Sequence, residues 1–386
     1  TGGKKDLRGN YFINENTGYV VGLSGTILKT TNAGNNWLSL NSGTNKFLMS
    51  VYFMNENTGF VVGDSGIFLK TINSGIIWNT ISIGETRNLQ SVWFINANTG
   101  IIGGTEKVLR TTDGGLNWVG VYTLSLLQEL SGIQFLNLNT GIIVGGGGTI
   151  LLSTNAGINW TSQAPFGNDL YSVSFCDSLN GITVGTSGRI RRTTDGGVSW
   201  INQISGITDN LNSIKMLNYN SAIVVGYRGK ILYTTNSGLN WINYILITSN
   251  DIYSVFITNV NNAYISGDFG SLLKTTNSGL VGINDVTEYK NKEYRLFQNY
   301  PNPFNPVTKI NYELPASRQG GRITNYISLK VYDILGNEVA NLVNEKKNPG
   351  SYGVEFDGSK LSSGIYFVSL LVNGNVIDTK SMVLVK

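Results

Sequence analysis

The residue types that carry most enzymatic and metal chemistry are scarce in this chain. Its 386 residues include no histidine and one cysteine, Cys176. Without histidine the chain lacks the commonest general base and zinc ligand, which excludes Ser-His-Asp, Cys-His and His-Glu-x-x-His sites. Cys176 stands where an equivalent segment has Met54, so we expect a small apolar residue, not a reactive thiol. We therefore predict no catalytic residue, no metal site and no cofactor.

Arginine is the remaining residue type that gathers at one place. Arg189, Arg191 and Arg192 lie within four residues, and guanidinium groups bind carboxylates and phosphates. Arg191 occupies a strand position where the equivalent segments have leucine, and a charge there is costly unless it is paired or solvated. Either these arginines contact an anion or a partner, or Arg191 pairs with a local carboxylate. The carboxylates considered for that pair are Asp169, Asp177 and Asp195.

A repeat defines these positions. The stretch Thr30 to Trp37 (TTNAGNNW) recurs five times with its tryptophan, and a seventh copy, Thr275 to Gly282, has lost it. Successive tryptophans are 40 to 42 residues apart, a period typical of stacked repeats. Recurrence favours a packing role for the tryptophans over a sugar-stacking platform. The Asn or Asp of each copy is expected to bond its own turn rather than a ligand.

Each period predicts four short strands. In residues 47–87, Leu48 to Phe53 alternates as a strand, Phe60 to Gly63 is a short apolar strand, and Asp64-Ser65 has hairpin spacing before a third strand. The Gly, Asn and β-branched content disfavours helical repeats. We predict an all-β chain with a seven-bladed β-propeller over residues 1–283. Its first strands are expected to begin near Leu7, Leu48, Leu89, Leu130, Leu170, Leu211 and Ile252.

The repeat resembles two known patterns. T-x-[DN]-x-G-x-x-W is similar to the Asp-box, or bacterial neuraminidase repeat, and the longer G-x-x-G-x-I-L-K-T-T-x-x-G-x-x-W unit resembles the propeller repeat of photosystem II stability and assembly factors. The Asp-box raises a sialidase-like glycan hydrolase as one alternative. That activity needs an arginine cluster, a tyrosine nucleophile with a carboxylate, and an acid; no matching arrangement is found. We expect a protein without catalysis.

Positions where blades differ are better candidates for binding. The tips of the second hairpins vary, and in a propeller they gather on one face. The tip residues predicted to bind a ligand are Asp64, Glu106, Tyr227, Arg228, Asp268 and Phe269. Basic residues also share one register in five blades, which predicts a partial ring of solvated charges or a weak attraction to acidic polymer. These basic residues are Lys29, Lys70, Arg110, Arg192 and Lys274.

The seventh blade departs from the pattern. Its fourth strand, Gly282 to Val286, is weak, so the blade is expected to expose an edge that could pair with another chain. This edge supports a second hypothesis, in which subunits assemble into an extracellular fibre or surface layer as a homo-oligomer or polymer. The first residue, Thr1, is neither methionine nor part of a leader, as expected of a processed chain or a fragment.

The C-terminal part is a second domain. Residues 284–295 are charged and aperiodic and predict a linker, and alternating strands follow in residues 296–386, spaced as in a small immunoglobulin-like β-sandwich. This part closely resembles the type A C-terminal sorting domain of the type IX secretion system. The matching segments are Tyr300–Pro306, Leu329–Gly336, Leu361–Val368 and Lys380–Lys386. The resemblance implies the type IX secretion machinery as a partner and an extracellular or outer-membrane-surface location.

Composition limits the remaining partners. Only 13% of residues are charged and the formal net charge is +4, so a nucleic-acid partner is not expected. No apolar run is long enough to span a bilayer. The sequence thus favours a secreted or cell-surface binding or adhesion protein, whose ligand would be a surface glycan or protein.

Overall fold

The computed structural model describes residues 5–163, 167–245, 249–259, 261–275, 287–288, 294–314, 325–334, 336–348 and 350–386. The chain forms two compact units, Thr1–Tyr289 and Lys290–Lys386.

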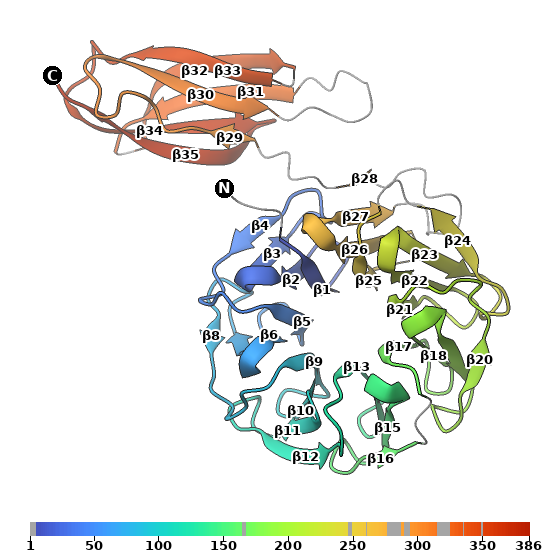
Figure 1. Cartoon of the computed structure of the whole chain (residues 1–386). Helices are drawn as coiled ribbons and strands as arrows, with labels where there is room; N and C mark the ends of the chain where they lie inside the picture. The colour runs from blue at the N-terminus through green and yellow to red at the C-terminus, as the bar shows by residue number, and fades with distance from the viewer. Residues whose placement is uncertain are drawn as a thin grey trace. The chain divides into compact units, whose positions relative to one another are not determined.

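The first unit contains seven antiparallel four-stranded sheets, each built from consecutive strands and arranged in a ring (Figure 1). The predicted seven-bladed propeller is confirmed, and each first strand begins at the predicted residue. Blade one contains β1 (Leu7–Phe12), β2 (Gly18–Gly22), η1 (Leu23–Gly25), β3 (Thr26–Thr30) and β4 (Leu38–Leu40). Blade two contains β5 (Leu48–Phe53), β6 (Gly59–Gly63), η2 (Asp64–Gly66), β7 (Phe68–Thr71) and β8 (Asn79–Thr80). Blade three contains β9 (Leu89–Phe94), β10 (Gly100–Gly104), β11 (Lys107–Thr111) and β12 (Val119–Thr123).

The other four blades repeat this order, with a short 3-10 turn between the second and third strands. They contain β13 (Leu130–Phe135), β14 (Gly141–Gly145), η3 (Gly146–Gly148), β15 (Ile150–Ser153) and β16 (Thr161–Ser162); β17 (Leu170–Phe175), β18 (Gly181–Gly185), η4 (Thr186–Gly188), β19 (Ile190–Thr193) and β20 (Ile201–Gln203); β21 (Leu211–Met216), β22 (Ala222–Gly226), η5 (Tyr227–Gly229), β23 (Lys230–Thr234) and β24 (Ile242–Ile245); β25 (Ile252–Ile257), β26 (Ala263–Gly267), η6 (Asp268–Gly270), β27 (Leu272–Thr275) and β28 (Thr287–Glu288).

Burial explains the strand composition. Each second strand is buried along its whole length, because its two faces pack against both neighbouring blades; this accounts for apolar runs such as GFVVG in β6. The first strands lie nearest the axis of the ring (Figure 1). Gly63, at the end of β6, passes so close to the chain that a Cβ atom there would lie 2.0 Å from the carbonyl oxygen of Phe47, so glycine is required for this approach.

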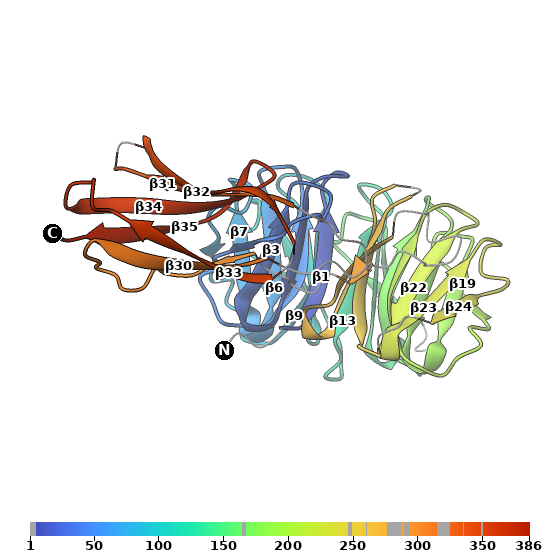
Figure 2. The ribbon, with the colours of Figure 1, turned by 90° about the horizontal axis from the view of Figure 1, so that it is seen from above.

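The strand order gives the propeller two different faces. Because consecutive strands are antiparallel, the second-hairpin tips and the loops between blades lie on one face, here named the tip face. The first-hairpin turns and the turns between third and fourth strands lie on the other, the repeat-turn face. Figure 2 shows the blades from the side, with their strands running between these faces.

The repeated Thr-x-Asn/Asp-x-Gly segment forms the turn between the third and fourth strands. In blade one, the Thr30 hydroxyl oxygen accepts from the Gly34 N–H (2.9 Å), and the Asn32 carboxamide oxygen accepts from the Asn36 N–H (2.9 Å). Equivalent bonds occur in the next five blades. The Asn and Asp side chains therefore complete their own turns, as predicted. In blade seven the turn lies outside the described residues.

The tryptophans are packing residues, also as predicted. Trp78, Trp160 and Trp200 are buried. Trp160 meets the ring of Phe135 edge-on at 6.0 Å and donates its indole N–H to the Gly157 carbonyl at 3.1 Å. Both the apolar ring and its polar edge are thus used within the blade.

The predicted ring of basic residues is not a solvated ring. Lys29 donates to the carbonyl oxygen of Ser74 in the next blade, at 2.8 Å. The other four members make the same contact to the next repeat turn: Lys70 to Gly114, Arg110 to Ala156, Arg192 to Ser237 and Lys274 to Ala33. These side chains tie neighbouring blades together.

Side chains close the ring between blades seven and one. Asn10 in β1 donates to the Tyr264 carbonyl (3.3 Å) and accepts from the Ser254 hydroxyl (2.9 Å). Phe12 stacks on Tyr264 with ring centroids 3.9 Å apart. These contacts join the first and last blades of the ring.

The open edge expected in blade seven is covered in part. Strand β28 pairs with Leu273 and Lys274 of β27, and β28 lies inside the segment predicted as a linker. The weak strand expected at Gly282 to Val286 lies outside the described residues, as does most of the predicted linker.

The second unit is a two-sheet sandwich. One sheet has the order β29 (Arg295–Leu296), β30 (Val307–Leu314), β33 (Gly350–Asp357), and the other β32 (Glu338–Lys347), β31 (Asn325–Tyr332), β34 (Gly364–Val372), β35 (Asn375–Leu384). One hydrophobic cluster lies between them, including Phe304, Ile310, Leu329 and Val368. Strand β32 is an edge strand with four charged residues and one buried residue, so it lacks the regular alternation of a half-buried strand.

Candidate functional site

The hairpin tips are held on the tip face by one recurring hydrogen bond. The second residue of a tip adopts positive φ, between 53° and 67°, in every blade. In five blades its N–H donates to the side chain of an Asn or Asp that precedes the first strand of the following blade. The pairs are Ser65–Asn88, Gly147–Asp169, Ser187–Asn210, Arg228–Asp251 and Phe269–Asp6, at 2.8 to 3.1 Å. Since all blades share this conformation, the positive φ of Arg228 and Phe269 belongs to the scaffold.

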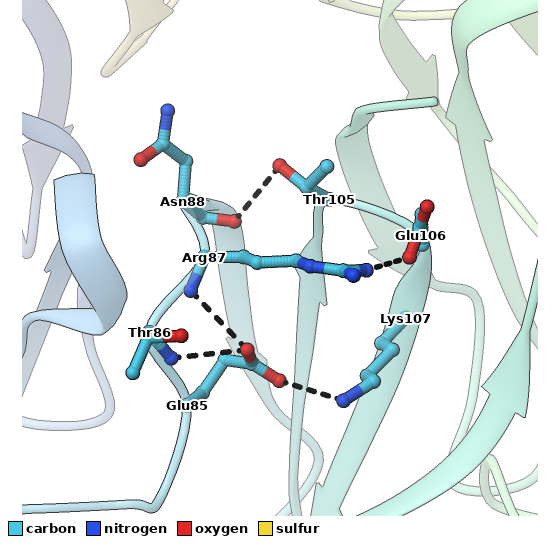
Figure 3. Close-up of polar contacts among 7 residues, drawn as sticks. All are labelled: Glu85, Thr86, Arg87, Asn88, Thr105, Glu106 and Lys107. Carbon is cyan, nitrogen blue, oxygen red and sulfur yellow. Dashed lines mark hydrogen bonds and ion pairs between the residues drawn. The ribbon is translucent and has the colours of Figure 1, made fainter. Parts of the chain in front are cut away.

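Glu106, a predicted binding residue, is already engaged (Figure 3). Its carboxylate forms an ion pair with Arg87, and Lys107 lies 3.1 Å from the carboxylate of Glu85. The Glu85 carboxylate also accepts the N–H groups of Thr86 and Arg87. Burial opposes the ionisation of Glu85, yet these bonds hold its pKa below the ordinary value. The two ion pairs join the loop after blade two to the tip of blade three, which makes Glu106 part of the scaffold.

Other predicted tip residues remain accessible. Phe269 is 58% exposed, and the Arg228 side chain is 79% exposed and 3.5 Å from Asp209. Tyr227 is partly buried beside it. These residues offer an aromatic ring and a guanidinium group on adjacent blades, six and seven.

Nearer the axis, the tip face carries a polar group that we name the axial tip cluster: Arg8, Asp64, Glu129, Tyr253 and Asp268. Arg8 and Tyr253 are the second residues of β1 and β25. The Arg8 guanidinium carbon lies 3.6 Å from the centre of the Tyr253 ring, and the Tyr253 hydroxyl donates to Asp268. Arg8 also acts electrostatically on Asp64 and Glu129.

Carboxyl groups of the axial tip cluster are poorly compensated. Burial raises the pKa of Asp64 against the opposing charges of Lys46 and Arg8. Burial, together with the charges of Asp64 and Asp169, raises the pKa of Glu129. Burial also raises the pKa of Asp268 despite the bond from Tyr253. Such shifts mark groups whose charge lacks a matching partner.

Two atoms of the axial tip cluster are buried without a partner. In the described part of the chain, Arg8 Nε and Asp64 Oδ1 have no hydrogen-bond partner and almost no exposed surface. A buried polar atom left unpaired costs about 1 to 3 kcal/mol. Among the described residues, Arg8 Nε thus lacks an acceptor and Asp64 Oδ1 lacks a donor.

Sequence reasoning found Asp64 and Asp268 but missed Arg8, Glu129 and Tyr253. Glu129 precedes the first strand of blade four, whereas for Arg8 and Tyr253 the missed signal is the variable residue after the repeated leucine or isoleucine of each first strand. This position holds Arg8, Met49, Gln90, Ser131, Tyr171, Asn212 and Tyr253. It faces the axis because first strands are innermost, a fact that follows from the propeller and not from any one repeat.

The three arginines of blade five do not form one site. Arg191 is only 5% exposed and is paired in register with Thr183 and Asn202 inside the blade. Arg192 donates to Ser237 in the next repeat turn, and Arg189 follows the tip. Among the carboxylates suggested as partners of Arg191, Asp169 accepts the Gly147 N–H, and Asp177 and Asp195 accept N–H groups of their own turns. Arg191 therefore belongs to the interior of the propeller.

Cys176 is partly exposed. Burial and the neighbouring Asp177 raise the pKa of its thiol to about 11. Among the described residues, no three carboxylates or thiols come close enough to hold a metal ion. The same residues include no helix long and apolar enough to cross a membrane.

Comparisons with known proteins agree with this fold. Residues 5–87, 35–165 and 161–291 match the family model described as photosynthesis system II assembly factor YCF48. Residues 298–385 match the secretion system C-terminal sorting domain. No curated protein is significantly similar in sequence.

Solved propellers are similar in structure. "YCF48 bound to D1 peptide" and YCF48 from Cyanidioschyzon merolae each have a TM-score of 0.60 and 16% identity, covering 71% of this chain and 92% and 96% of theirs. The WD40 propeller domain of Doa1 has a TM-score of 0.59 and 17% identity, with 71% and 93% covered. At these identities the likeness concerns the fold.

The sorting domain fixes the location. A type IX C-terminal sorting domain marks proteins that are secreted or held at the outer-membrane surface, and it implies passage through the type IX secretion machinery. Repeats matching one family model extend over most of the propeller. The chain therefore belongs to the YCF48 photosynthesis system II assembly factor family, and it carries this sorting domain at its C-terminal end.

Proposed function

We propose that the protein is an extracellular binding or adhesion module without catalysis, and that it binds its ligand through the tip face. The observation that carries the proposal is the unpartnered pair of buried atoms, Arg8 Nε and Asp64 Oδ1, in the axial tip cluster. Tips held by recurring hydrogen bonds present this cluster on a rigid frame, which limits the entropy lost on binding.

The ligand is expected to carry positive charge. Asp64, Glu129 and Asp268 all have raised pKa values, so a cation bound among them would stabilise their ionised forms. Exposed Phe269 and Arg228 extend the surface outward. A similar propeller has been solved with a bound peptide, which makes a basic peptide the first ligand class to test.

Several features support a role without catalysis. A sialidase-like site needs several arginines that converge on one ligand. In blade five, Arg191 is buried and Arg192 donates to the carbonyl oxygen of Ser237 in the next blade. Glu106 is held in an ion pair with Arg87. We therefore propose that the Asp-box resemblance reflects the architecture of the turn and not an active site.

A peptide and glycan array tests this proposal with the full chain. Basic peptides should bind, and the paired change Arg8→Met with Asp64→Asn should weaken binding about tenfold. The matched control is Lys360→Met, on an exposed side chain of the second unit. Unchanged binding in the paired variant, or hydrolysis of an arrayed glycan, would contradict the proposal.

Exposed aliphatic side chains favour self-assembly as a second candidate function. In five blades the residue after the repeat-turn glycine is aliphatic and 51% to 76% exposed. These residues are Ile76, Leu116, Ile158, Val198 and Leu239. Repeated apolar groups on one face suit contact with a second copy. Light scattering over a wide concentration range tests this: Ile76→Asn with Leu239→Asn should reduce association, and a monomer at all concentrations rules it out.

A further inference from the structure

The axis of the propeller is lined differently near the repeat-turn face. The fifth residue of each first strand lies there, one residue before the strand ends. Going round the ring these residues are Tyr11, Tyr52, Trp93, Gln134, Ser174, Lys215 and Phe256. All but Ser174 are partly exposed. Blades seven, one, two and three thus contribute aromatic rings, and blades four, five and six contribute polar side chains.

The aromatic residues form a continuous arc. Ring centroids are 5.3 Å apart for each of Phe256–Tyr11, Tyr11–Tyr52 and Tyr52–Trp93. Contacts at this spacing are typical of aromatic packing. Because the rings are partly exposed, the arc presents flat apolar surface along the axis.

Lys215 ends the arc without a charged partner. Its ammonium nitrogen lies 5.2 Å from the centre of the Phe256 ring. It makes no hydrogen bond or ion pair with any described residue, whereas its neighbours in the polar series bond the next blade: Gln134 with Phe175, and Ser174 with Met216. Burial alone lowers the pKa of Lys215. The ammonium group is thus partly removed from water with only an aromatic face in compensation.

A second donor lies on the other side of Phe256. The Tyr11 ring contacts Phe256, and its hydroxyl makes no hydrogen bond with the described residues. The Lys215 ammonium group and the Tyr11 ring therefore both contact the Phe256 ring. A carboxylate accepts hydrogen bonds from both donor types, and a ring attached to it could stack on the exposed arc.

We infer that this axial arc is a binding site for a carboxylate attached to an aromatic or sugar ring. Lys215 pairs with the carboxylate, and Tyr52 and Trp93 contact the ring. The site is distinct from the axial tip cluster, which lies at the opposite ends of the same first strands and favours cations. The proposed function does not depend on it.

Two pairs of small ligands test the inference by calorimetric titration of the full chain. N-acetylphenylalanine represents a peptide carboxyl terminus, with its amide as the neutral match. Methyl glucuronide represents an acidic glycan, with methyl glucoside as its match. At least one carboxylate should bind, its neutral match should bind about tenfold more weakly, and the preferred pair identifies the source.

Variants make the test specific. Lys215→Gln should abolish the preference for the carboxylate over its neutral match. Trp93→Leu should weaken the binding of both ligands of the preferred pair. Lys360→Met should bind as the parent chain does. Because Lys215 is partly exposed and unpaired, its replacement should not lower the thermal unfolding temperature, which separates lost binding from lost folding. Absence of binding by both carboxylates, or an unchanged preference in Lys215→Gln, overturns the inference.

Discussion

The ammonium nitrogen of Lys29 lies 2.8 Å from the carbonyl oxygen of Ser74. The two residues belong to different blades, and Ser74 is in the turn completed by Asn73. Lys29 also lies 5.4 Å from the centre of the Tyr19 ring, whose hydroxyl donates to the same carbonyl. A repeated basic residue and a repeated turn thus form a single connection between blades.

Removing this connection should destabilise the propeller. We expect Lys29→Met to lower the free energy of unfolding by about 1 to 2 kcal/mol, the range for a lost bond from a charged donor at a partly exposed site. Lys29→Arg should be close to the parent, because Arg110 and Arg192 make the same bond elsewhere. Urea denaturation measures the free energy of unfolding of both variants. If Lys29→Met is as stable as the parent chain, the bond does not contribute to stability.

The repeat turns should make the propeller sensitive to acid. The carboxylate of Asp113 accepts hydrogen bonds from the backbone N–H of Asn117, the side-chain amide of Asn117 and the Thr111 hydroxyl. These bonds lower the pKa of Asp113, and the backbone bond has the largest effect. A lowered folded-state pKa gives stability that is complete above the unfolded value of about 4. That stability is lost as pH falls through the folded-state pKa.

Asp113→Asn keeps one oxygen to accept the bonds from the Asn117 backbone N–H and the Thr111 hydroxyl, as asparagine does in four other turns. It removes the titration and the second oxygen, which accepts from the Asn117 side-chain amide. Its stability should therefore fall less than that of the parent between about pH 5 and pH 2. Thermal unfolding across this range gives the comparison. If the stability of the variant and that of the parent fall equally with pH, Asp113 does not contribute to the acid sensitivity.

Cys176 should react slowly. Burial, then the charge of Asp177, raises the pKa of the thiol to about 11, so only about one molecule in a thousand is a thiolate near pH 8. We expect alkylation by iodoacetamide to be more than about tenfold slower than that of a free cysteine peptide. Asp177→Asn should accelerate it. Rapid labelling of the native parent chain would contradict the raised pKa.

In the sorting domain, Phe304 should be critical for folding. It is 2% exposed, and its backbone bonds both Val383 and Val385 at 2.9 Å, which holds the last strand in place. Phe304→Ala should cost about 3 to 5 kcal/mol, whereas the matched change Tyr300→Ala, at a site 81% exposed, should cost little. Calorimetry of the full chain should show the loss in the transition of the second unit only. A shift in the propeller transition instead would contradict the assignment of this loss to the second unit.

Repetition made much of the fold predictable. The regular spacing of Trp37, Trp78 and Trp118, with alternating apolar residues between them, indicated four strands per period and the start of every first strand. It also assigned Asn32 and its equivalents to their turns, because a position that recurs in every blade serves what the blades share. Strand β32 cannot be predicted in this way, because it belongs to no repeat and is an edge strand with one buried residue.

The candidate site was less predictable, because its members come from different blades. Sequence comparison between repeats selected Asp64 and Asp268 as variable tip residues, but it also selected Glu106, which Arg87 engages, and Arg191, which is buried. Only the closed ring brings Arg8 of blade one onto Tyr253 of blade seven, residues 245 positions apart in the sequence.

The sequence by itself determined the repeat unit, the number of blades and the sorting domain, because these depend on local periodicity and on contiguous motifs. The tertiary structure decided which charges face one another across the ring. Closure places the first strands around a common axis, and burial there leaves Arg8 Nε, Asp64 Oδ1 and the Lys215 ammonium group short of partners. These groups are ordinary in sequence and become candidates for binding only through their shared position.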